Sequence, residues 1–247
     1  MMGMIANKVV VVTGSGAGLG RALVEAFLEQ GCIVVGIGRH ETEIAQAAAG
    51  YRQIKADVAD ARQVRAAFDE IRTVYGRVDV LFNNAAVYPR VSFLDESAEA
   101  FADALAINLG GVANCCKAVL PLMIQQGWGR IYNVGSWADV APIGRSAVYS
   151  ASKGGLHALT KAIAADTLDI VADLQIHEWI PGHMKTQMSD FTGMEPRTCA
   201  DWAVCIVRRD DASARSCIFE GDREWRPLES LRARIKKRVL FWRSTAG

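Results

Sequence analysis

Short, strongly apolar runs alternate along the chain with longer amphipathic stretches. The apolar runs have the length of β-strands buried on both faces, and the stretches between them have helical periodicity. The predicted strands are Val9–Val12, Ile33–Ile37, Gln53–Ala56, Val78–Phe82, Arg130–Val134, Leu174–Ile180 and Ser216–Phe219. The predicted helices are Leu19–Gln30, Glu41–Ala49, Ala61–Tyr75, Ala98–Gln126, Ala147–Val171 and Thr198–Arg208. Such alternation is typical of a parallel sheet covered by helices on two sides.

The pattern therefore predicts an α/β domain of the Rossmann type, a doubly wound parallel sheet with helices on both faces. We expect seven strands, in the order 3-2-1-4-5-6 extended by the seventh. The length of 247 residues suits one such domain. We assign residues 1–225 to this domain and residues 226–247 to a basic, amphipathic C-terminal helix or tail.

Composition narrows the class of protein further. Hydrophobic residues make up 51% of the chain and charged residues 22%, which permits a large core and excludes global disorder. The 28 basic and 27 acidic residues give a net charge of +1. Domains that bind nucleic acid over their whole surface carry a clear basic excess, so we expect no nucleic-acid partner.

The six cysteines form no CxxC pair and no zinc-binding spacing with histidine, so we expect no metal site. Adjacent Cys115 and Cys116 could form a strained vicinal disulfide, but small residues on a buried helix are the favoured interpretation. No run reaches about 18 continuous apolar residues, and the start of the chain lacks the order of a signal peptide. We therefore expect a cytoplasmic protein.

A glycine-rich turn follows the first predicted strand and opens the first predicted helix. Glycines let the backbone approach a pyrophosphate, and a helix N-terminus offers N–H groups with partial positive charge. The turn would also suit tight packing of strand against helix, but its strand–turn–helix context favours nucleotide binding. The predicted contacts are Gly14, Ser15, Gly16, Gly18, Leu19 and Gly20.

The end of the second predicted strand bears on the choice of nucleotide. Domains that prefer NAD usually place an acidic residue there to bind the ribose 2′-hydroxyl. This chain has Gly38 followed by Arg39. Glycine removes the repulsion between a carboxylate and a 2′-phosphate, and arginine can pair with that phosphate, so we favour NADP(H) over NAD(H). Asp57 either binds the adenine amino group or caps the helix that follows Asp60.

Tyr149 and Lys153 lie four residues apart in a helical stretch, which places both side chains on one face. A phenol with a pKa near ~10 is a poor base at neutral pH unless a cation stabilises the phenolate. We expect Lys153 to supply that cation and to lower the pKa of Tyr149. Ser136 ends the fifth predicted strand at the carboxyl edge of the sheet, where ligands bind.

From about Val9 to Thr186 these motifs resemble the classical short-chain dehydrogenase/reductase family. TGSGAGLG matches the TGxxxGxG turn of that family, and Asn83-Asn84-Ala85-Ala86 resembles its NNAG element with alanine for the last glycine. The remaining matches are the adenine-contact pair Asp57-Val58, the tetrad Asn108, Ser136, Tyr149 and Lys153, and Pro181-Gly182 with Thr186.

The resemblance implies a role for each residue of the tetrad. Tyr149 exchanges the proton with the substrate oxygen, and Ser136 hydrogen-bonds that oxygen. Lys153 lowers the pKa of the tyrosine and holds the nicotinamide ribose, while Asn108 kinks its helix and positions a water. The resemblance also implies cofactor contacts from Asn84, Ala85, Tyr149, Lys153, Pro181, Gly182 and Thr186.

Two segments depart from the family pattern. His177-Glu178-Trp179-Ile180 precedes Pro181, where the family often has an asparagine, and Phe219-Glu220-Gly221-Asp222 matches the last strand of the family only in part. Candidates for contact with substrate follow the strand ends and suggest a largely apolar pocket. They are Tyr88, Trp137, His183 and Met188, together with Asp139, Met184 and Phe191.

We therefore expect an NADP(H)-dependent oxidoreductase that acts on a small-molecule alcohol or ketone. The alternatives are a nucleotide-binding redox regulator or subunit of the same fold, and a membrane-peripheral protein that acts through its basic tail. The intact tetrad argues against a regulator, because a sensor needs no proton relay. The resemblance also implies a homodimer or homotetramer that pairs through the long helices after Ser97 and Ser146.

The tail from Arg226 to Gly247 holds seven basic residues and one acid, whereas the rest of the chain has a net charge of −5. Apolar residues recur at helical spacing within it, so it either packs on the protein itself, which we favour, or contacts anionic lipid weakly. If it contacts lipid, the full chain will sediment with anionic liposomes and a chain ending at residue 225 will not. Equal sedimentation of the two chains would remove the membrane hypothesis.

Overall fold

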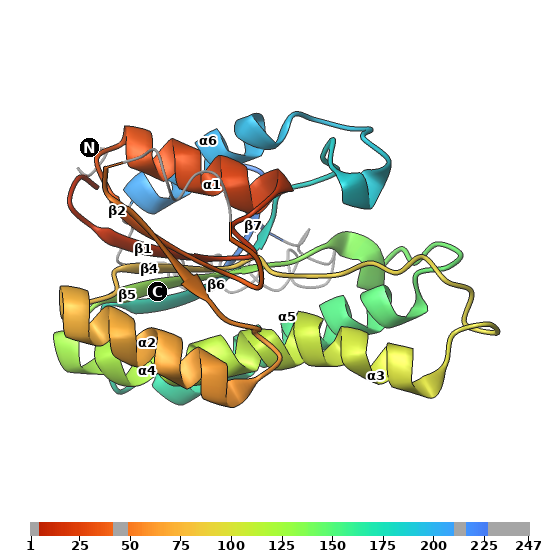
Figure 1. The fold of residues 1–247 in the computed structure, drawn as a ribbon, viewed down its shortest axis with the longest axis horizontal. Helices are drawn as coiled ribbons and strands as arrows, with labels where there is room; N and C mark the ends of the chain where they lie inside the picture. Colours follow the sequence, from red (N-terminus) through yellow and green to blue (C-terminus); the bar gives the residue numbers. More distant parts are fainter. Residues whose placement is uncertain (1–4, 42–48, 210–215, 227–247) are drawn as a thin grey trace, which may run out of the picture.

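The computed structural model describes residues 5–41, 49–209 and 216–226 (Figure 1). The helix predicted over residues 41–49 and the basic tail after residue 226 lie outside this described part of the chain, apart from their outermost residues.

One sheet of eight strands runs through the middle of the domain, in the order β3-β2-β1-β4-β5-β6-β7-β8. Its strands are β1 (Val9–Thr13), β2 (Ile33–Gly38), β3 (Tyr51–Lys55), β4 (Val80–Asn83), β5 (Gly129–Val134), β6 (Leu174–Ile180), β7 (Ile218–Glu220) and β8 (Arg223–Trp225). All pairings are parallel except the last, in which β8 runs antiparallel to β7. The predicted doubly wound fold and its strand order are confirmed.

The prediction of seven strands is short by one. β8 is a three-residue edge strand that follows the tight turn Gly221-Asp222, where Gly221 has a φ of +58°. Its sequence Arg-Glu-Trp contains no apolar run, so hydrophobic patterning does not mark it as a strand. β8 pairs antiparallel with β7 at the edge of the sheet.

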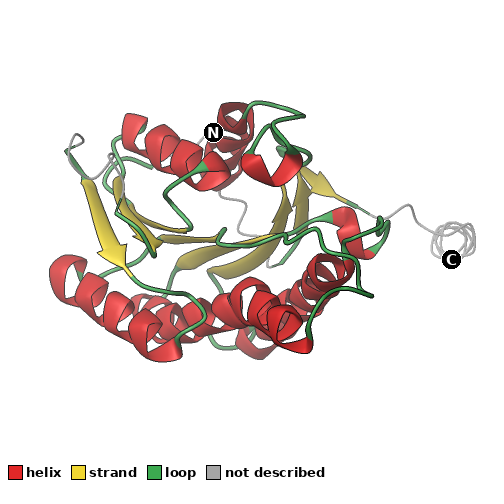
Figure 2. Cartoon of the chain, turned by 45° about the vertical axis from the view of Figure 1, so that its right-hand side comes forward, coloured by secondary structure: helices red, strands yellow, loops and turns green. Residues whose placement is uncertain are grey.

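Helices cover the two faces of the sheet (Figures 1 and 2). Six α-helices lie in the described part of the chain: α1 (Gly18–Glu29), α2 (Ala61–Tyr75), α3 (Ala98–Leu105), α4 (Gly111–Gln126), α5 (Ala147–Thr167) and α6 (Pro196–Arg208). In Figure 1, α1 and α6 lie above the sheet, and α2, α4 and α5 lie below it. Alternate residues of each strand serve the two layers: Val10 and Val12 pack with α1, and Val9 and Val11 pack with α2 and α4. This two-faced burial explains why the central strands are apolar throughout.

The helix predicted over Ala98–Gln126 is interrupted. α3 passes into a five-residue π-helical turn, Ala106–Gly110, before α4 begins. The whole 29-residue stretch has a mean hydropathy of 1.4 in its most apolar window, long and apolar enough to cross a membrane by length and composition. Its apolar side packs instead on β4, β5 and α2, which accounts for that composition.

All six cysteines lie in the described residues and are free thiols. Cys115 and Cys116 are fully buried on α4, as the favoured interpretation of this pair predicts, and no vicinal disulfide joins them. Burial raises the pKa of the Cys116 thiol to about 12, and it raises the pKa of Cys115 as well.

Candidate active site

The glycine-rich turn after β1 is shaped by close backbone contacts. A Cβ added to Gly14 would lie 2.9 Å from the Cα of Ala85, and one added to Gly20 would lie 2.0 Å from the carbonyl oxygen of Gly14. The Asn84 amide donates to the carbonyl oxygens of Thr13 (2.9 Å) and Gly14 (3.3 Å). Glycine is thus required at both positions, and the end of β4 braces the turn.

The N-terminus of α1 opens onto this turn. Its N-cap residue, Ala17, makes no side-chain hydrogen bond to the helix, and the first turn holds no acidic residue. The first N–H groups therefore lack a side-chain partner and present partial positive charge. Gly16 and Ala17 are exposed at this place, whereas Ser15, Leu19 and Gly20 are buried beneath it. Such an N-terminus is suited to a phosphate group.

The loop after β6 comes to the same helix terminus. A Cβ on Gly18 would lie 3.2 Å from Cγ2 of Thr186, so the two residues are in contact. Gly182 turns the chain with a φ of +90°, directly after the buried Pro181. The predicted Pro181-Gly182 and Thr186 element therefore lies over the predicted nucleotide turn, although the two are some 165 residues apart in sequence.

Arg39 lies at the end of β2 with an exposed side chain that meets no hydrogen-bond or ion-pair partner in the described residues. Nearby, the Tyr51 hydroxyl contacts the Ser15 hydroxyl at 3.4 Å. Gly36 makes this contact possible, because a Cβ there would lie 2.2 Å from the Tyr51 oxygen. Ser15 is fully buried, so it supports the turn from beneath.

Asp60, and not Asp57, caps α2: its carboxylate accepts from the backbone N–H groups of Arg62 (2.8 Å) and Gln63 (3.3 Å). Among the described residues, the Asp57 carboxylate accepts only from the N–H of Ala59, at 2.9 Å. Of the two interpretations of Asp57, the helix cap is therefore wrong. Its neighbour Val58 is buried against α4.

Asn108 lies within the π-helical turn and is 1% exposed. Its side chain accepts from the backbone N–H of Val87 (2.8 Å) and donates to the Val87 carbonyl (2.9 Å) and to the Ser152 hydroxyl (3.1 Å). These bonds tie the loop after β4 to α5. The irregular turn occurs where the family resemblance implies a kinked helix.

Tyr149 and Lys153 lie one turn apart on α5, facing the end of β5. Lys153 is 3% exposed, and its ammonium donates to the carbonyl of Val134 at 2.6 Å. The ammonium nitrogen lies 5.5 Å from the centre of the Tyr149 ring. Burial lowers the pKa of Lys153 to about 8.

Ser136 lies beside the Tyr149 hydroxyl, and its own hydroxyl accepts from the N–H of Ala138 at 3.2 Å. Burial raises the pKa of Tyr149, and Ser136 only partly opposes this. The expected lowering of this pKa is therefore absent from the protein alone. The physical reason is desolvation of the buried phenol, to which neighbouring Tyr88 adds, while the Lys153 ammonium donates to the Val134 carbonyl.

The contacts of the candidate substrate residues place some of them beside Tyr149 and others in the surrounding loops. Tyr88 stacks on Tyr149 with ring centres 4.7 Å apart, so it lies in the site. Trp137 instead donates to the Glu220 carboxylate at 2.9 Å and packs against Trp225, which joins it to the β7–β8 hairpin. The remaining candidates lie in the two loops that border the site: His183, bonded to Thr192, the exposed Met188 and Phe191, the half-buried Met184, and Asp139, packed near Gly154.

A carboxylate–imidazole pair lies behind the tetrad, and the sequence alone does not point to it. Glu178, in the middle of β6, meets His157 of α5 with an Oε2–Nδ1 distance of 2.5 Å. The signal for it was a carboxylate within a strand that is otherwise buried on both faces. Its partner could not be identified from spacing, since the two residues lie 21 positions apart on different elements.

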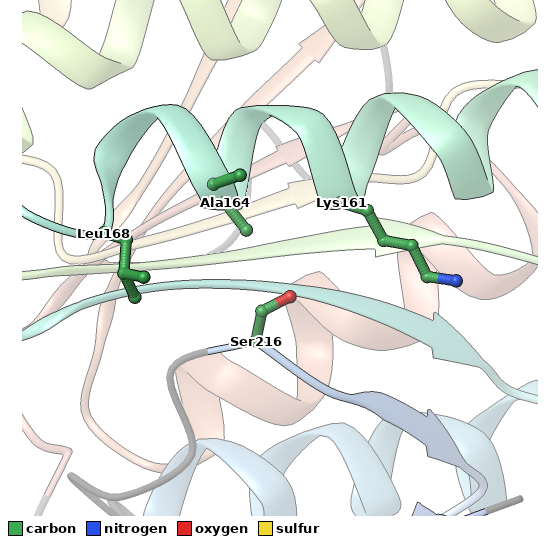
Figure 3. A pocket seen from close by; sticks show the side chains of 5 residues that line it. Lys161, Ala164, Leu168 and Ser216 are labelled. Carbon is green, nitrogen blue, oxygen red and sulfur yellow. The ribbon is translucent and has the colours of Figure 1, made fainter.

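A separate hollow of about 250 Å³ lies between the last turns of α5 and the start of β7 (Figure 3). Lys161, Ala164, Ala165, Leu168 and Ser216 line it. Because β7 begins at this end of the sheet, the hollow is remote from the carboxyl edge that holds the tetrad. It is not the candidate active site.

Comparisons with known proteins identify the family of the chain. The sequence model of the family described as short chain dehydrogenase matches residues 8–195. A 3alpha-hydroxysteroid dehydrogenase of Mediterraneibacter gnavus is 30% identical over 197 residues, covering 76% of this chain and 78% of that protein. A probable galactose dehydrogenase, GalD, of Rhizobium meliloti is 32% identical over 230 residues, covering 84% and 90%.

A solved structure described as a putative short-chain dehydrogenase/reductase from Burkholderia xenovorans superposes with a TM-score of 0.76. It is 25% identical in sequence and covers 89% of this chain and 97% of its own. The chain therefore belongs to the short-chain dehydrogenase/reductase family, a family of oxidoreductases that use NAD(P) and act on alcohol or carbonyl groups of small molecules.

The close contact beneath the glycine turn predicts the effect of one methyl group. Gly20→Ala will raise the Kd of the nicotinamide dinucleotide about tenfold or more, since relieving such overpacking costs about 1–3 kcal/mol and displaces the turn. Fluorescence titration of the reduced dinucleotide measures this. Gly144→Ala is the matched control, because a Cβ there meets nothing within 4 Å. Equal affinities in the two variants would contradict the proposed phosphate turn.

Proposed function

We propose that this protein is an NADP(H)-dependent oxidoreductase that interconverts an alcohol and a ketone or aldehyde. One observation carries the proposal: Ser136 lies beside the Tyr149 hydroxyl and lowers its pKa, and Tyr149 lies one helical turn from the buried Lys153 ammonium. This acid–base group is at the same sheet edge as the N-terminus of α1 and its glycine turn. Family membership supports the reaction class.

Each residue of the candidate site has its own role in the proposed reaction. The nicotinamide group supplies the hydride chemistry when bound. Ser136 donates to the substrate oxygen and polarises the carbonyl, while Tyr149 gives that oxygen its proton in reduction and takes it in oxidation. Lys153 keeps a positive charge beside the phenol, which favours the phenolate in the oxidation direction. Asn108 positions α5 by joining the loop at Val87 to Ser152.

The preference for NADP(H) is supported by Gly38 and Arg39. No carboxylate stands at the end of β2 to repel a 2′-phosphate, and Arg39 is exposed there without a partner in the described residues. A guanidinium that is not already engaged loses no ion pair when it binds a phosphate. Asp57 is half-buried after β3, and one of its carboxylate oxygens accepts from the N–H of Ala59. Its other oxygen is proposed to accept a hydrogen bond from the adenine amino group.

We propose a bulky, largely apolar alcohol or ketone as the substrate class. Exposed apolar side chains border the site from two loops: Val140 and Ile143 before α5, and Met188 and Phe191 after β6. One relative is described as a 3alpha-hydroxysteroid dehydrogenase, and a hydroxysteroid is an alcohol of this bulky, apolar kind. The free thiols support a location in the reducing cytoplasm, which is part of the same proposal. The long helices support pairing of subunits into a homo-oligomer.

Replacing the proposed acid–base group tests the reaction. Tyr149→Phe will lower kcat/KM for carbonyl reduction by about 10²-fold or more, because general acid–base catalysis typically contributes that much. Loss of NADPH absorbance against a carbonyl panel measures it, and NADPH binding will persist. Tyr75→Phe is the control, because the Tyr75 ring on α2 packs against the core between the sheet and the helices α2 and α4, away from the candidate site. Unchanged turnover in Tyr149→Phe, or none in the wild type with cofactor bound, would overturn the proposed function.

Cofactor choice is tested separately. Arg39→Ala will raise the Kd of NADPH about 10- to 100-fold, because a charge-assisted hydrogen bond contributes about 1.5–3 kcal/mol. The Kd of NADH will stay within about twofold by the same argument, since NADH has no 2′-phosphate for the guanidinium to bind. Calorimetric titration of both dinucleotides gives the ratio. Arg72→Ala, an exposed arginine near the end of α2, is the control, and an equal loss for both dinucleotides would contradict the assignment.

A further inference from the structure

Glu178 is a carboxylate in the interior of the sheet. It lies on β6 between β5 and β7, and only 3% of the residue is exposed. Its neighbours along the strand, His177 and Trp179, contact the aromatic cluster on the α6 side of the sheet, so Glu178 faces α5. A charge buried in this way costs several kcal/mol unless it is paired. Its partners therefore indicate what it does.

The absence of a side chain at residue 135 makes room for the carboxylate. A Cβ on Gly135 would lie 2.1 Å from Oε1 of Glu178. Gly135 stands between Val134, whose carbonyl holds the Lys153 ammonium, and Ser136, which lies beside the Tyr149 hydroxyl. The carboxylate thus lies against the single peptide segment that positions both parts of the acid–base group.

The other carboxylate oxygen meets Nδ1 of His157 at 2.5 Å. His157 lies on α5 one turn after Lys153, and its side chain is 30% exposed. It joins the interior carboxylate to the surface. His157 supplies the hydrogen bond that a buried carboxylate needs in order to remain charged.

Titratable groups face this carboxylate from each element packed on it. They are Lys153 and His157 of α5 and Asp139 of the turn after β5. Burial raises the pKa of Glu178, Asp139 raises it further, and His157 and Lys153 lower it. The interaction is reciprocal: burial lowers the pKa of Lys153 to about 8, and the charge of Glu178 opposes that fall.

We propose that Glu178, held by His157, is a positioning residue that keeps the Lys153 ammonium charged for the acid–base step at Tyr149. The proposal rests on the proposed function for its catalytic meaning. It extends the acid–base group from Tyr149 and Lys153 through Glu178 to His157 at the surface. Neither Glu178 nor His157 touches the reacting atoms.

The direction of the effect follows from the charges. Without the carboxylate charge the ammonium loses stabilisation, so the pKa of Lys153 in Glu178→Gln falls below that of the wild type. An opposite charge within about 4–6 Å is worth about 1–3 pKa units, and for this carboxylate we expect a shift of about one unit. In alcohol oxidation the active form has Lys153 protonated. The alkaline limb of kcat/KM against pH will therefore move about one unit to lower pH.

Two measurements read this out. The first is the pH profile of kcat/KM for alcohol oxidation in the wild type and in Glu178→Gln. The second needs no substrate: the protein is labelled with [ε-¹³C]lysine, and the ¹³Cε shift of Lys153, assigned with Lys153→Arg, is followed against pH by NMR. An unchanged Lys153 titration in folded Glu178→Gln would overturn the proposal.

His157 provides a matched pair of variants on a partly exposed position, so that folding does not decide the outcome. His157→Asn can retain an N–H donor near the position of Nδ1, whereas His157→Leu removes it. We expect His157→Leu to lower the Lys153 pKa in the same direction as Glu178→Gln, and His157→Asn to restore most of the wild-type value. If Glu178→Gln does not fold, this pair carries the test, and equal titration of Lys153 in both variants would overturn the proposal.

The two readouts separate this inference from the proposed function. If the wild type turns over no alcohol while Glu178→Gln still lowers the pKa of Lys153, the proposed function fails and the charge coupling stands. If alcohol is oxidised but neither the Lys153 titration nor the alkaline limb moves, Glu178 is only a structural ion-pair partner and this inference fails. A shift of both readouts together supports both.

Discussion

Burial of a parallel sheet on both faces is the constraint on which the rest of the structure depends. Parallel neighbours need a crossover for each strand, so the helices must lie on the two faces and the carboxyl ends of the strands must meet at one edge. The glycine turn after β1, Arg39 after β2 and Ser136 after β5 come together for that reason. The place of the candidate site, at the carboxyl edge of the sheet, therefore follows from the packing of the core.

The site itself is assembled through contacts that leave no room for a side chain. Gly20 lets α1 start against Gly14, and Gly135 lets a carboxylate of β6 lie beside β5. At each of these glycines, the absence of a side chain allows the close approach of another group. Polar side chains then hold the loops in register, with Asn84 bonded to the β1 turn and Asn108 bonded between Val87 and Ser152.

Electrostatics at the site are governed by desolvation. Burial disfavours the charge on Lys153 and the phenolate of Tyr149 alike, so the protein alone keeps the phenol protonated more strongly than water would. The Val134 carbonyl and the Glu178 carboxylate favour the ammonium, and Ser136 favours the phenolate. The balance among these groups, and not the tyrosine–lysine spacing, sets the protonation state of the site.

By itself the sequence determined the fold class and the order of the first seven strands, and it proposed a tetrad, because hydrophobic periodicity and short motifs act over a few residues at a time. It did not reveal β8, which lacks an apolar run and forms on the free edge of β7. Nor did it reveal that Asp60 caps α2, that Trp137 bonds to Glu220, or that Glu178 pairs with His157. The last two are contacts between distant elements, and the direction of the Tyr149 pKa depends on burial, so only the tertiary structure decided them.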